Sequence, residues 1–342
     1  MSTISFKPQK VTKRITSQLA TRASDVIMNR FGLTTDGKRK TLEEIGKKYN
    51  ITRERVRQVE DVALNSIKKS DVYKGEQAVF DELKVLVNKL GSIVAEHELL
   101  AHISKDKATQ NHIHFFLVLS DAFKKHREDD HFHARWSVDD QITEKVHETL
   151  KKLYAGLNDE DLVTEAEMIK KFFEHMKEVS EEYKNEEIAR RWLSMSKTVS
   201  KNPLGEWGKA SSPNIRTRGV KDYAYLVMRK SGSPMHFKEV ADAISKTFDK
   251  KIHYATCHNE LIKDPRFVLV GRGMYALAEW GYKKGIAREV IADILKREGP
   301  LSKDEVIKRV NKERYFKTNT ILVNLVNPKY FKKNKTGQYS TV

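Results

Sequence analysis

The sequence contains little of what supports export, disulfide bonding or membrane insertion. Its 342 residues include a single cysteine, Cys257, which excludes an internal disulfide framework and indicates a reducing compartment. No apolar run approaches the roughly 20 residues that span a bilayer. The amino-terminal stretch MSTISFKPQKVTKR lacks the hydrophobic core of a secretory signal. We therefore expect a cytoplasmic protein without a membrane partner.

Catalytic and metal-binding patterns are also missing. The sequence has no P-loop, no GxSxG and no zinc-protease motif, and Gly271-Arg-Gly273 is typical of a hairpin turn rather than a nucleotide loop. Twelve histidines offer two pairs spaced two residues apart and one group beside the cysteine (His112 and His114; His131 and His133; His253 with Cys257 and His258). None of these provides a usual zinc ligand set. We expect no enzyme activity, no cofactor and no metal.

The net charge of +17 is distributed unevenly along the chain. Residues 1–75 hold 17 Lys and Arg against 8 Asp and Glu, residues 76–210 hold 20 against 26, and residues 211–342 hold 27 against 13. Two basic ends flank an acidic middle, which favours a polyanionic partner at both ends. The alternative is that the charge serves only solubility.

The stretch TLEEIGKKYNITRERVRQVEDVALNSIK, residues 41–68, predicts two helices joined by a tight corner. Thr41 and Glu44 form a capping-box pattern at the start of the first helix, which ends at Tyr49. Asn50 suits the left-handed conformation of the corner, and Thr52 can cap the second helix.

The second helix has two chemically distinct sides. At 100° per residue, its apolar residues share one side (Val56, Val59, Ala63 and Ile67) and polar groups share the other (Arg53, Glu54, Arg57 and Gln58). Arg matches the two acceptors of guanine, Gln matches adenine, and Glu accepts from cytosine. The pattern therefore predicts a DNA recognition helix, although a merely solvated face is the alternative.

The segment from about residue 21 to residue 69 closely resembles region four of the housekeeping bacterial sigma factors. The resemblance rests on the motifs TLEEIG and RERVRQVE, which are separated by six residues, and on RASDVIMNRFGL, which precedes them. The resemblance implies a helix-turn-helix that reads the upstream promoter hexamer. Arg53, Glu54, Arg57 and Gln58 would touch bases or the adjacent backbone, and Thr41 and Thr52 would anchor phosphates. It also implies RNA polymerase core as a partner. Residues 1–20 are expected to be a polar tail, in which a short helix over 11–19 is an open alternative. Such a tail is too short for a promoter-melting domain, so the chain should not open a promoter alone.

The remaining sequence predicts four winged helices in series. Helices are expected over 78–90, 96–103, 111–125, 143–157, 165–176 and 186–197, with a strand over 131–138 and a hairpin over 199–208. The predicted fold is mainly α, with small β-hairpin wings. The predicted domains are a tail (1–20), the helix-turn-helix (21–75) and winged helices at 76–140, 141–212, 213–281 and 282–342.

The last two winged helices repeat one another. SPMHFKEV at 233–240 corresponds to GPLSKDEV at 299–306, and equivalent residues lie 63 to 66 positions apart. In each copy the proline is expected to start a helix. The later glycine (Gly273, Gly337) should lie in a hairpin, and the tyrosine beyond it (Tyr275, Tyr339) should pack the wing onto the core.

Residues 199–281 resemble the HARE-HTH winged-helix family, through NPLGEWG, RGVKDYAYLVM, SPMHFKEVADAI and FVLVGRGMYAL. That family includes the amino-terminal domain of the RNA polymerase delta subunit, and its members are tied to transcription, chromatin and DNA modification. Basic residues of the last two winged helices are further candidates for DNA contact (Arg272, Lys317, Thr318, Lys332, Lys333 and Lys335). Solubilising loops and protein-binding wings are the alternatives.

Three functions are compatible with these patterns. The first is a cytoplasmic, nucleoid-associated transcription regulator that binds promoter-like double-stranded DNA and acts with RNA polymerase. The second is a delta-like accessory protein of RNA polymerase whose winged helices bind protein, with DNA contact secondary. The third is an accessory protein of DNA modification or restriction. The oligomeric state is left open.

Overall fold

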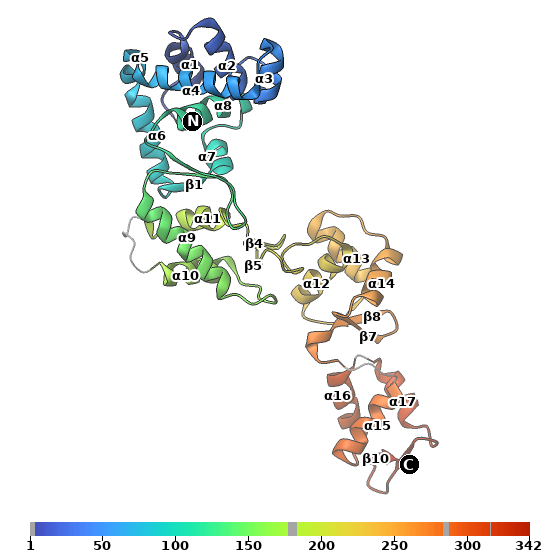
Figure 1. Cartoon of the computed structure of the whole chain (residues 1–342). Helices are drawn as coiled ribbons and strands as arrows, with labels where there is room; N and C mark the ends of the chain where they lie inside the picture. Colours follow the sequence, from blue (N-terminus) through green and yellow to red (C-terminus); the bar gives the residue numbers. More distant parts are fainter. Residues whose placement is uncertain (1–3, 177–182, 283–286, 315) are drawn as a thin grey trace. The chain divides into compact units, whose positions relative to one another are not determined.

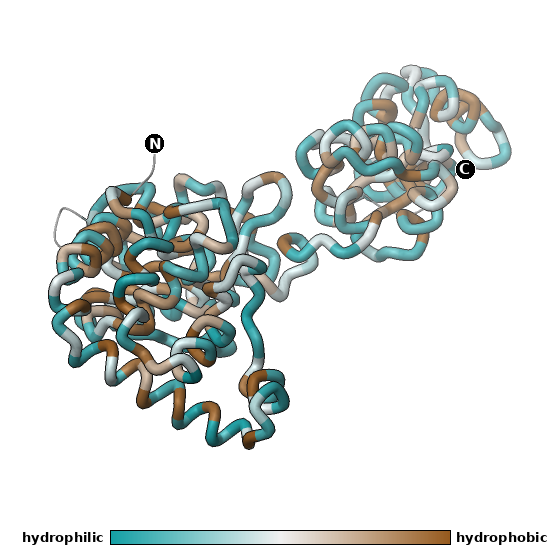
Figure 2. Tube along the Cα trace, turned by 90° about the horizontal axis from the view of Figure 1, so that it is seen from above, coloured by the Kyte–Doolittle hydropathy of each residue, from teal (hydrophilic) through white to brown (hydrophobic). Residues whose placement is uncertain are grey.

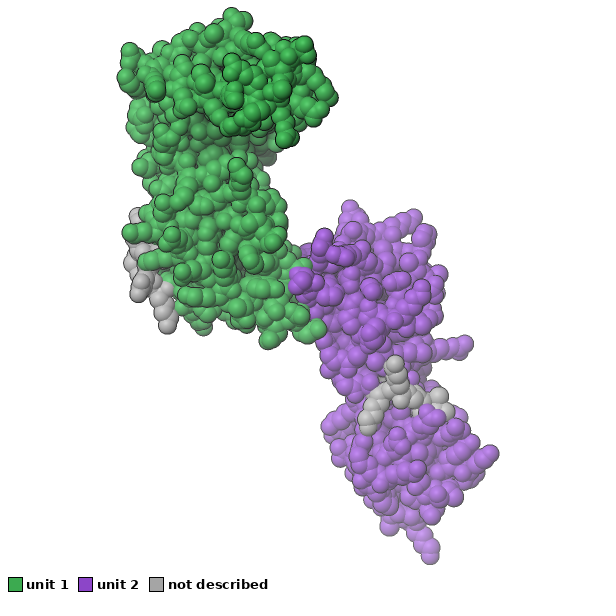
Figure 3. All heavy atoms as spheres, viewed as in Figure 1, with its two compact units in different colours: residues 1–201, 207–210 green, residues 202–206, 211–342 purple. Residues whose placement is uncertain are grey.

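A computed structural model describes residues 4–176, 183–282, 287–314 and 316–342. The chain forms two compact units, the first reaching Lys201 and including Trp207–Ala210, the second made of Asn202–Glu206 and Ser211–Val342 (Figure 3). Most of the described elements are helices, accompanied by short antiparallel sheets (Figure 1). The fold is therefore mainly α, with a helix-turn-helix followed by winged helices, as the sequence predicts.

The first unit begins with five helices: α1 (Pro8–Thr16), α2 (Thr21–Phe31), α3 (Leu42–Tyr49), α4 (Arg53–Lys69) and α5 (Asp71–Gly75). One order of elements then recurs twice in this unit: a helix, a short extended segment, two helices and two strands. The first occurrence is α6 (Gln77–Lys89), β1 (Ile93–Ala95), α7 (Glu96–Ile103), α8 (Lys107–Leu119), β2 (Lys124–His126) and β3 (Arg135–Ser137). The second is α9 (Asp140–Ala155), the bridge residue Val163, α10 (Glu165–His175), α11 (Glu186–Ser194), β4 (Val199–Lys201) and β5 (Trp207–Lys209).

The second unit repeats the same order twice more. The third occurrence is α12 (Val220–Ser231), β6 (Met235–His236), α13 (Phe237–Phe248), α14 (Tyr254–Lys263), β7 (Phe267–Gly271) and β8 (Met274–Leu277), followed by the 3-10 helix η2 (Ala278–Trp280). The fourth is α15 (Ala287–Glu298), the bridge residue Leu301, α16 (Lys303–Glu313), α17 (Thr318–Leu325), β9 (Phe331–Lys333) and β10 (Tyr339–Thr341).

Strand pairing is the same in all four occurrences. The last strand pairs both with the preceding strand and with the early extended segment, giving the orders β1-β3-β2 and β6-β8-β7. In the second and fourth occurrences a single bridge replaces the early strand, Val163 with Trp207 and Leu301 with Tyr339. The bridge of Leu301 to Tyr339 repeats the pairing of Met235 with Tyr275. This topology is that of a winged helix, and it confirms the predicted duplication.

The hairpins of the duplicated pair also match the prediction, but the helix starts do not. Gly273 and Gly337 have positive φ in their hairpin turns, and Tyr275 and Tyr339 are buried. The prolines, however, precede a strand and a bridge residue rather than starting helices. The helices α13 and α16 begin behind His236 and Ser302, whose side chains accept hydrogen bonds from the first turn. A proline two residues before a cap therefore marks the extended segment in both copies.

One further expectation was wrong. The helix predicted over 111–125 runs from Lys107 to Leu119, and Lys124–His126 is a strand that pairs with β3. The amino-terminal segment does contain a short helix, α1, but its Val11 and Ile15 are buried in the first core rather than lying in a polar tail. The Thr12 hydroxyl is hydrogen-bonded to Nδ1 of His112 at 2.7 Å in a buried position, and this bond links α1 to α8.

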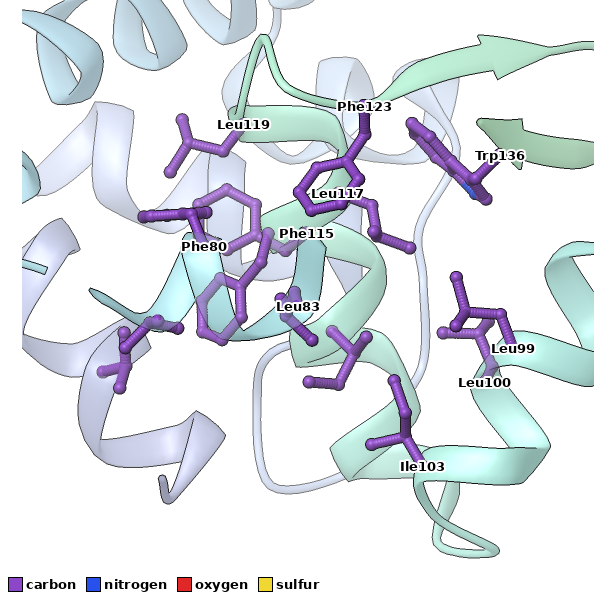
Figure 4. Packing of buried hydrophobic residues seen from close by; sticks show 14 of the residues in the cluster. Phe80, Leu83, Leu99, Leu100, Ile103, Phe115, Leu117, Leu119, Phe123 and Trp136 are labelled. Carbon is purple, nitrogen blue, oxygen red and sulfur yellow. The ribbon is translucent and has the colours of Figure 1, made fainter. Parts of the chain in front are cut away.

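The helix-turn-helix and the first winged helix share one hydrophobic core (Figure 4). The core is centred on α8, whose Phe115, Leu117 and Leu119 project among side chains of α6 and α7. The ring centroids of Phe31 on α2 and Phe115 on α8 are 5.0 Å apart. Core packing thus joins the predicted helix-turn-helix (21–75) to the first predicted winged helix (76–140). The exact domain boundaries remain predictions.

Strand β1 is shared by two cores. Val94 belongs to the first core, whereas Ile93 and Ala95 belong to the second core, formed around α9, α10 and α11. Gly91, just before the strand, has a φ of +112°, and a Cβ there would lie 2.8 Å from side-chain atoms of both Ile188 and Trp192. The Trp192 indole N–H donates to the Gly91 carbonyl at 3.1 Å. The first two winged helices therefore pack closely through β1.

Apolar and polar residues alternate along much of the chain, as the alternation of colours in Figure 2 shows. Among the described residues, no helix combines the length and apolar character required to cross a bilayer.

Candidate nucleic-acid interface

The helix α3 begins with a complete capping box. The Thr41 hydroxyl accepts from the Glu44 backbone N–H at 3.2 Å, and the Glu44 carboxylate accepts from the Thr41 backbone N–H and hydroxyl at 2.7 and 2.8 Å. These bonds lower the pKa of Glu44 below its ordinary value. The Thr41 hydroxyl already donates within the protein, so its predicted phosphate contact would require exchange of this bond.

The corner between α3 and α4 depends on two residues. Asn50 adopts the left-handed conformation with a φ of 51°, as the sequence predicts. The second is Gly46, which the sequence pattern did not indicate, because the need for glycine there arises from the close approach of the Ile51 backbone in the folded structure. A Cβ at Gly46 would lie 2.6 Å from the carbonyl oxygen of Ile51, whose N–H donates to the Gly46 carbonyl.

The helix α4 begins at the predicted cap. The Thr52 side chain accepts from the Arg55 backbone N–H at 3.2 Å, and the structure gives its hydroxyl hydrogen no acceptor among the described residues. Val56, Ala63 and Ile67 are buried on the inner side of the helix, and Val59 is partly buried. The residues predicted to read DNA, Arg53, Glu54, Arg57 and Gln58, are all exposed together on the outer side.

These exposed side chains differ in how far they are already engaged. Arg57 pairs with Glu54 at 2.6 Å and with Asp61 at 2.8 Å. The hydrogen bond between Arg57 and Glu54 lowers the pKa of the carboxyl and raises that of the guanidinium. Arg53, in contrast, has no hydrogen-bond or ion-pair partner within the described residues. Arg53 is therefore available at once, whereas Arg57 must exchange its carboxylate partners for a nucleic acid.

Arg55 is a further exposed residue of this helix that sequence analysis did not single out. Its Nη1 donates to Oε1 of Gln58 at 3.0 Å. The bond engages the oxygen of the Gln58 amide, and its NH₂ group has no hydrogen-bond partner among the described residues. The i to i+3 spacing on a helix could have indicated this pair.

Ion pairs behind the outer surface fix the three helices. Asp25 of α2 accepts from Lys48 Nζ at 2.6 Å and from the Tyr49 hydroxyl at 2.5 Å. Burial acts to raise the pKa of Asp25, but these hydrogen bonds outweigh burial and lower it. Arg30 of α2 reaches Glu60 of α4 at 3.2 Å. These contacts link α2 to both α3 and α4, and so hold α4 in a fixed position relative to the other two helices.

The remaining predicted contacts lie in the second unit. Arg272 is exposed in the turn between β7 and β8. Lys317 and Thr318 are exposed at the start of α17, and Lys332 and Lys333 are exposed on β9, followed by Lys335 in the turn. These six residues occupy the wing tips and one helix start of the last two winged helices, and their contact with DNA stays a prediction.

Metal coordination finds no support in the described residues, which contain no group of three or more His, Cys, Asp or Glu arranged to hold an ion. Cys257 is buried inside α14, and burial raises the pKa of its thiol to about 11. It packs as a small apolar residue.

Comparison with known proteins locates a relationship in the amino-terminal part of the chain. The family described as "Sigma-70, region 4" matches residues 17–69. The RNA polymerase sigma factor SigA1 of Synechococcus elongatus is 50% identical over 54 residues, which are 16% of this chain and 13% of that protein. SigA of Clostridium acetobutylicum is 47% identical over 55 residues, 16% of this chain and 14% of that protein. RpoD of Helicobacter pylori is 50% identical over 54 residues, 16% of this chain and 8% of that protein.

The chain thus matches only a small part of each of these sigma factors. The matched segment contains α2, α3 and α4 and ends at the last residue of α4. Residues 17–69 of this chain are a helix-turn-helix similar to region 4 of RNA polymerase sigma factors.

Proposed function

We propose that this protein is a sequence-specific, DNA-binding transcription regulator that recognises promoter-like DNA through its sigma-type helix-turn-helix. One observation carries the proposal: α4 presents Arg53, Glu54 and Gln58 together on an exposed outer side, inside the segment similar to sigma region 4. The protein would act in the cytoplasm, on the nucleoid and together with RNA polymerase. It would act by binding rather than catalysis.

The chemistry of the outer side of α4 suits base recognition in the major groove. The unpaired Arg53 can donate two hydrogen bonds to guanine, and the unbonded NH₂ of Gln58 can donate to an acceptor on a base edge. The free hydroxyl hydrogen of Thr52 can donate to a phosphate at the helix start. Glu54 can accept from cytosine once Arg57 has moved to a phosphate.

The basic wings of the second unit would add affinity without sequence information. Lys332, Lys333 and Lys335 lie within four residues on one exposed hairpin. Contacts of lysine with phosphates release counterions and depend little on base sequence. We therefore assign sequence choice to α4 and additional, salt-dependent affinity to these wings.

Selection of bound duplexes from a random pool tests the proposal. A selected sequence would then be used in competition titrations against a scrambled duplex. Arg53→Ala and Gln58→Ala should each weaken binding to the selected site by roughly 5- to 150-fold, as expected for a lost bidentate contact of about 1–3 kcal/mol. Lys47→Ala is the matched control, because Lys47 is exposed on α3 and pairs with Glu43. Full sequence preference in both α4 variants would contradict base reading by this helix.

A second candidate is an RNA polymerase accessory protein in which the winged helices bind protein. Its specific support is that Val323 and Val326, in and just after α17, are 69% and 62% exposed. The corresponding helix of a DNA-binding winged helix would be expected to present polar or basic groups there. Binding of core polymerase at moderate salt, lost in Val323→Asp but retained in Arg53→Ala, would favour this second function.

A further inference from the structure

A cavity of about 500 Å³ lies in the first unit. Its walls come from the loop between α2 and α3, from α7, from the amino-terminal half of α8 and from the segment between β2 and β3. The volume is within the roughly 300–1,000 Å³ typical of small-molecule sites. None of the residues that carry the DNA-binding proposal lines it.

Two cations line the cavity, Arg39 and Lys107, and neither forms a salt bridge with a carboxylate among the described residues. The Arg39 Nε donates to the neutral amide oxygen of Asn111 at 2.9 Å, and its terminal nitrogens have no hydrogen-bond partner among the described residues. Burial, the largest influence, lowers the pKa of this guanidinium below its ordinary value. Lys107, on the first turn of α8, likewise has no ion-pair partner within the described part of the chain.

The two carboxylates in the walls are already engaged by lysines outside the cavity. Glu96 lies 3.2 Å from Lys125, and Glu128 lies 2.8 Å from Lys197. Each acid therefore has a lysine counterion, and Glu96 also attracts Arg39 without bonding to it. The donors left unbonded among the charged lining residues are those of Arg39 and Lys107. Such a site favours an anionic ligand, and phosphate groups in particular accept hydrogen bonds from Arg and Lys together.

The remaining wall suits a flat ring. The imidazoles of His97 and His133 meet edge to face with their centroids 5.7 Å apart, and both residues line the cavity beside the buried Leu100. Aromatic rings and an aliphatic side chain offer stacking and apolar contact to a heterocycle. The cavity lining thus combines groups that favour an anion with groups that favour a ring.

We propose that this cavity binds a small phosphorylated heterocycle of the size of a nucleoside monophosphate, with Arg39 and Lys107 on the phosphate. The site is connected to the DNA-binding surface. The Asn111 amide that holds Arg39 also donates to the carbonyls of Gly32 and Gly37 at 3.0 and 2.8 Å. A ligand on Arg39 therefore contacts the loop that leads into Thr41 and α3, and any effect on DNA affinity must be reciprocal.

Isothermal titration of the full chain with the four common nucleoside 5′-monophosphates, in the absence of DNA, tests the proposal. We expect saturable binding of one molecule per chain by at least one of them, and much weaker binding of inorganic phosphate or of the unphosphorylated nucleoside. Lys107→Ala should weaken binding by about tenfold or more, as expected for loss of a hydrogen bond between charged groups.

Lys105→Ala provides the matched control. Lys105 is exposed two residues before Lys107 and lies outside the cavity walls, so both variants remove one positive charge from a strongly basic protein. Equal weakening by the two variants would show that the anion binds through overall charge and would overturn the proposal. Absence of saturable binding by all four nucleotides would do the same. Neither result would affect the DNA-binding proposal, because the titration contains no DNA.

Discussion

Replacing Gly46 with alanine should disrupt the helix-turn-helix corner although alanine is the better helix former. The added Cβ would lie 2.6 Å from the backbone carbonyl oxygen of Ile51. Since the Ile51 N–H is bonded to the Gly46 carbonyl, the two backbone segments can separate only if the corner opens. Backbone shifts forced by an extra methyl group in a packed site cost about 1–3 kcal/mol.

Gly75→Ala is the control that isolates this cost. Gly75 ends the helix α5, and a Cβ there would meet nothing within 4 Å. Both substitutions share the helix-propensity gain of alanine over glycine, at most about 1 kcal/mol. Gly46→Ala should therefore be less stable than Gly75→Ala by about 1–3 kcal/mol. For a folding unit of this size, that difference corresponds to about 2–12 °C in the melting temperature.

The assay is thermal unfolding of the full-length variants, followed by circular dichroism, together with binding to a selected DNA site. Opening of the corner would displace the start of α4, so Gly46→Ala should also lose affinity for that site more than for scrambled DNA. If Gly46→Ala melts at or above the temperature of Gly75→Ala, the close approach to Ile51 does not constrain the corner and the reasoning is refuted.

Three other predictions follow from the charges. Arg57→Ala should weaken binding to a selected site less than Arg53→Ala, because Arg57 must first leave two carboxylates; an equal or larger loss in competition titrations would contradict this. Joint replacement of Lys332, Lys333 and Lys335 by alanine should make the slope of log affinity against log salt shallower by up to about 2.7, at roughly 0.9 per phosphate contact, with the preferred sequence unchanged; an unchanged slope would remove this wing from the interface. His114 is buried and its pKa is lowered to about 3, chiefly by burial and then by Arg39, so the unfolded chain binds the proton more readily. The free energy of unfolding should therefore fall as the pH drops from 6.5, by up to about 2 kcal/mol at pH 5. In urea unfolding, the free energy of unfolding of His114→Gln should depend less on pH over this range than that of the parent protein.

The helix-turn-helix could be predicted from sequence because its signals are local. Thr41 with Glu44 marks one helix start, Thr52 marks the next, and Asn50 marks the corner, and each acts within four residues of its partner. The separation of buried Val56 from exposed Arg53 follows from helical periodicity alone. These features need no knowledge of distant parts of the chain.

The errors and omissions concern residues whose state depends on distant partners. Lys124–His126 is a polar edge strand without alternating apolar residues, and only its pairing with β3 makes it extended. The burial of α1 was not predicted because its sequence is mostly polar, yet Val11 and Ile15 pack into a core supplied by α8, about 100 residues away. The requirement for glycine at Gly46, and the cavity around Arg39, arise in the same way from tertiary approach.

The shared strand β1 has a consequence for how the first unit opens. With Val94 in one core and Ile93 and Ala95 in the other, the backbone amides that pair β1 with β3 cannot be exposed while either core stays folded. In hydrogen exchange these amides should accordingly be among the slowest of the protein, with protection close to that of complete unfolding of the unit. Local fraying of the helix-turn-helix corner would leave them protected, so the amides of β1 and those of the corner between α3 and α4 should exchange on well-separated timescales.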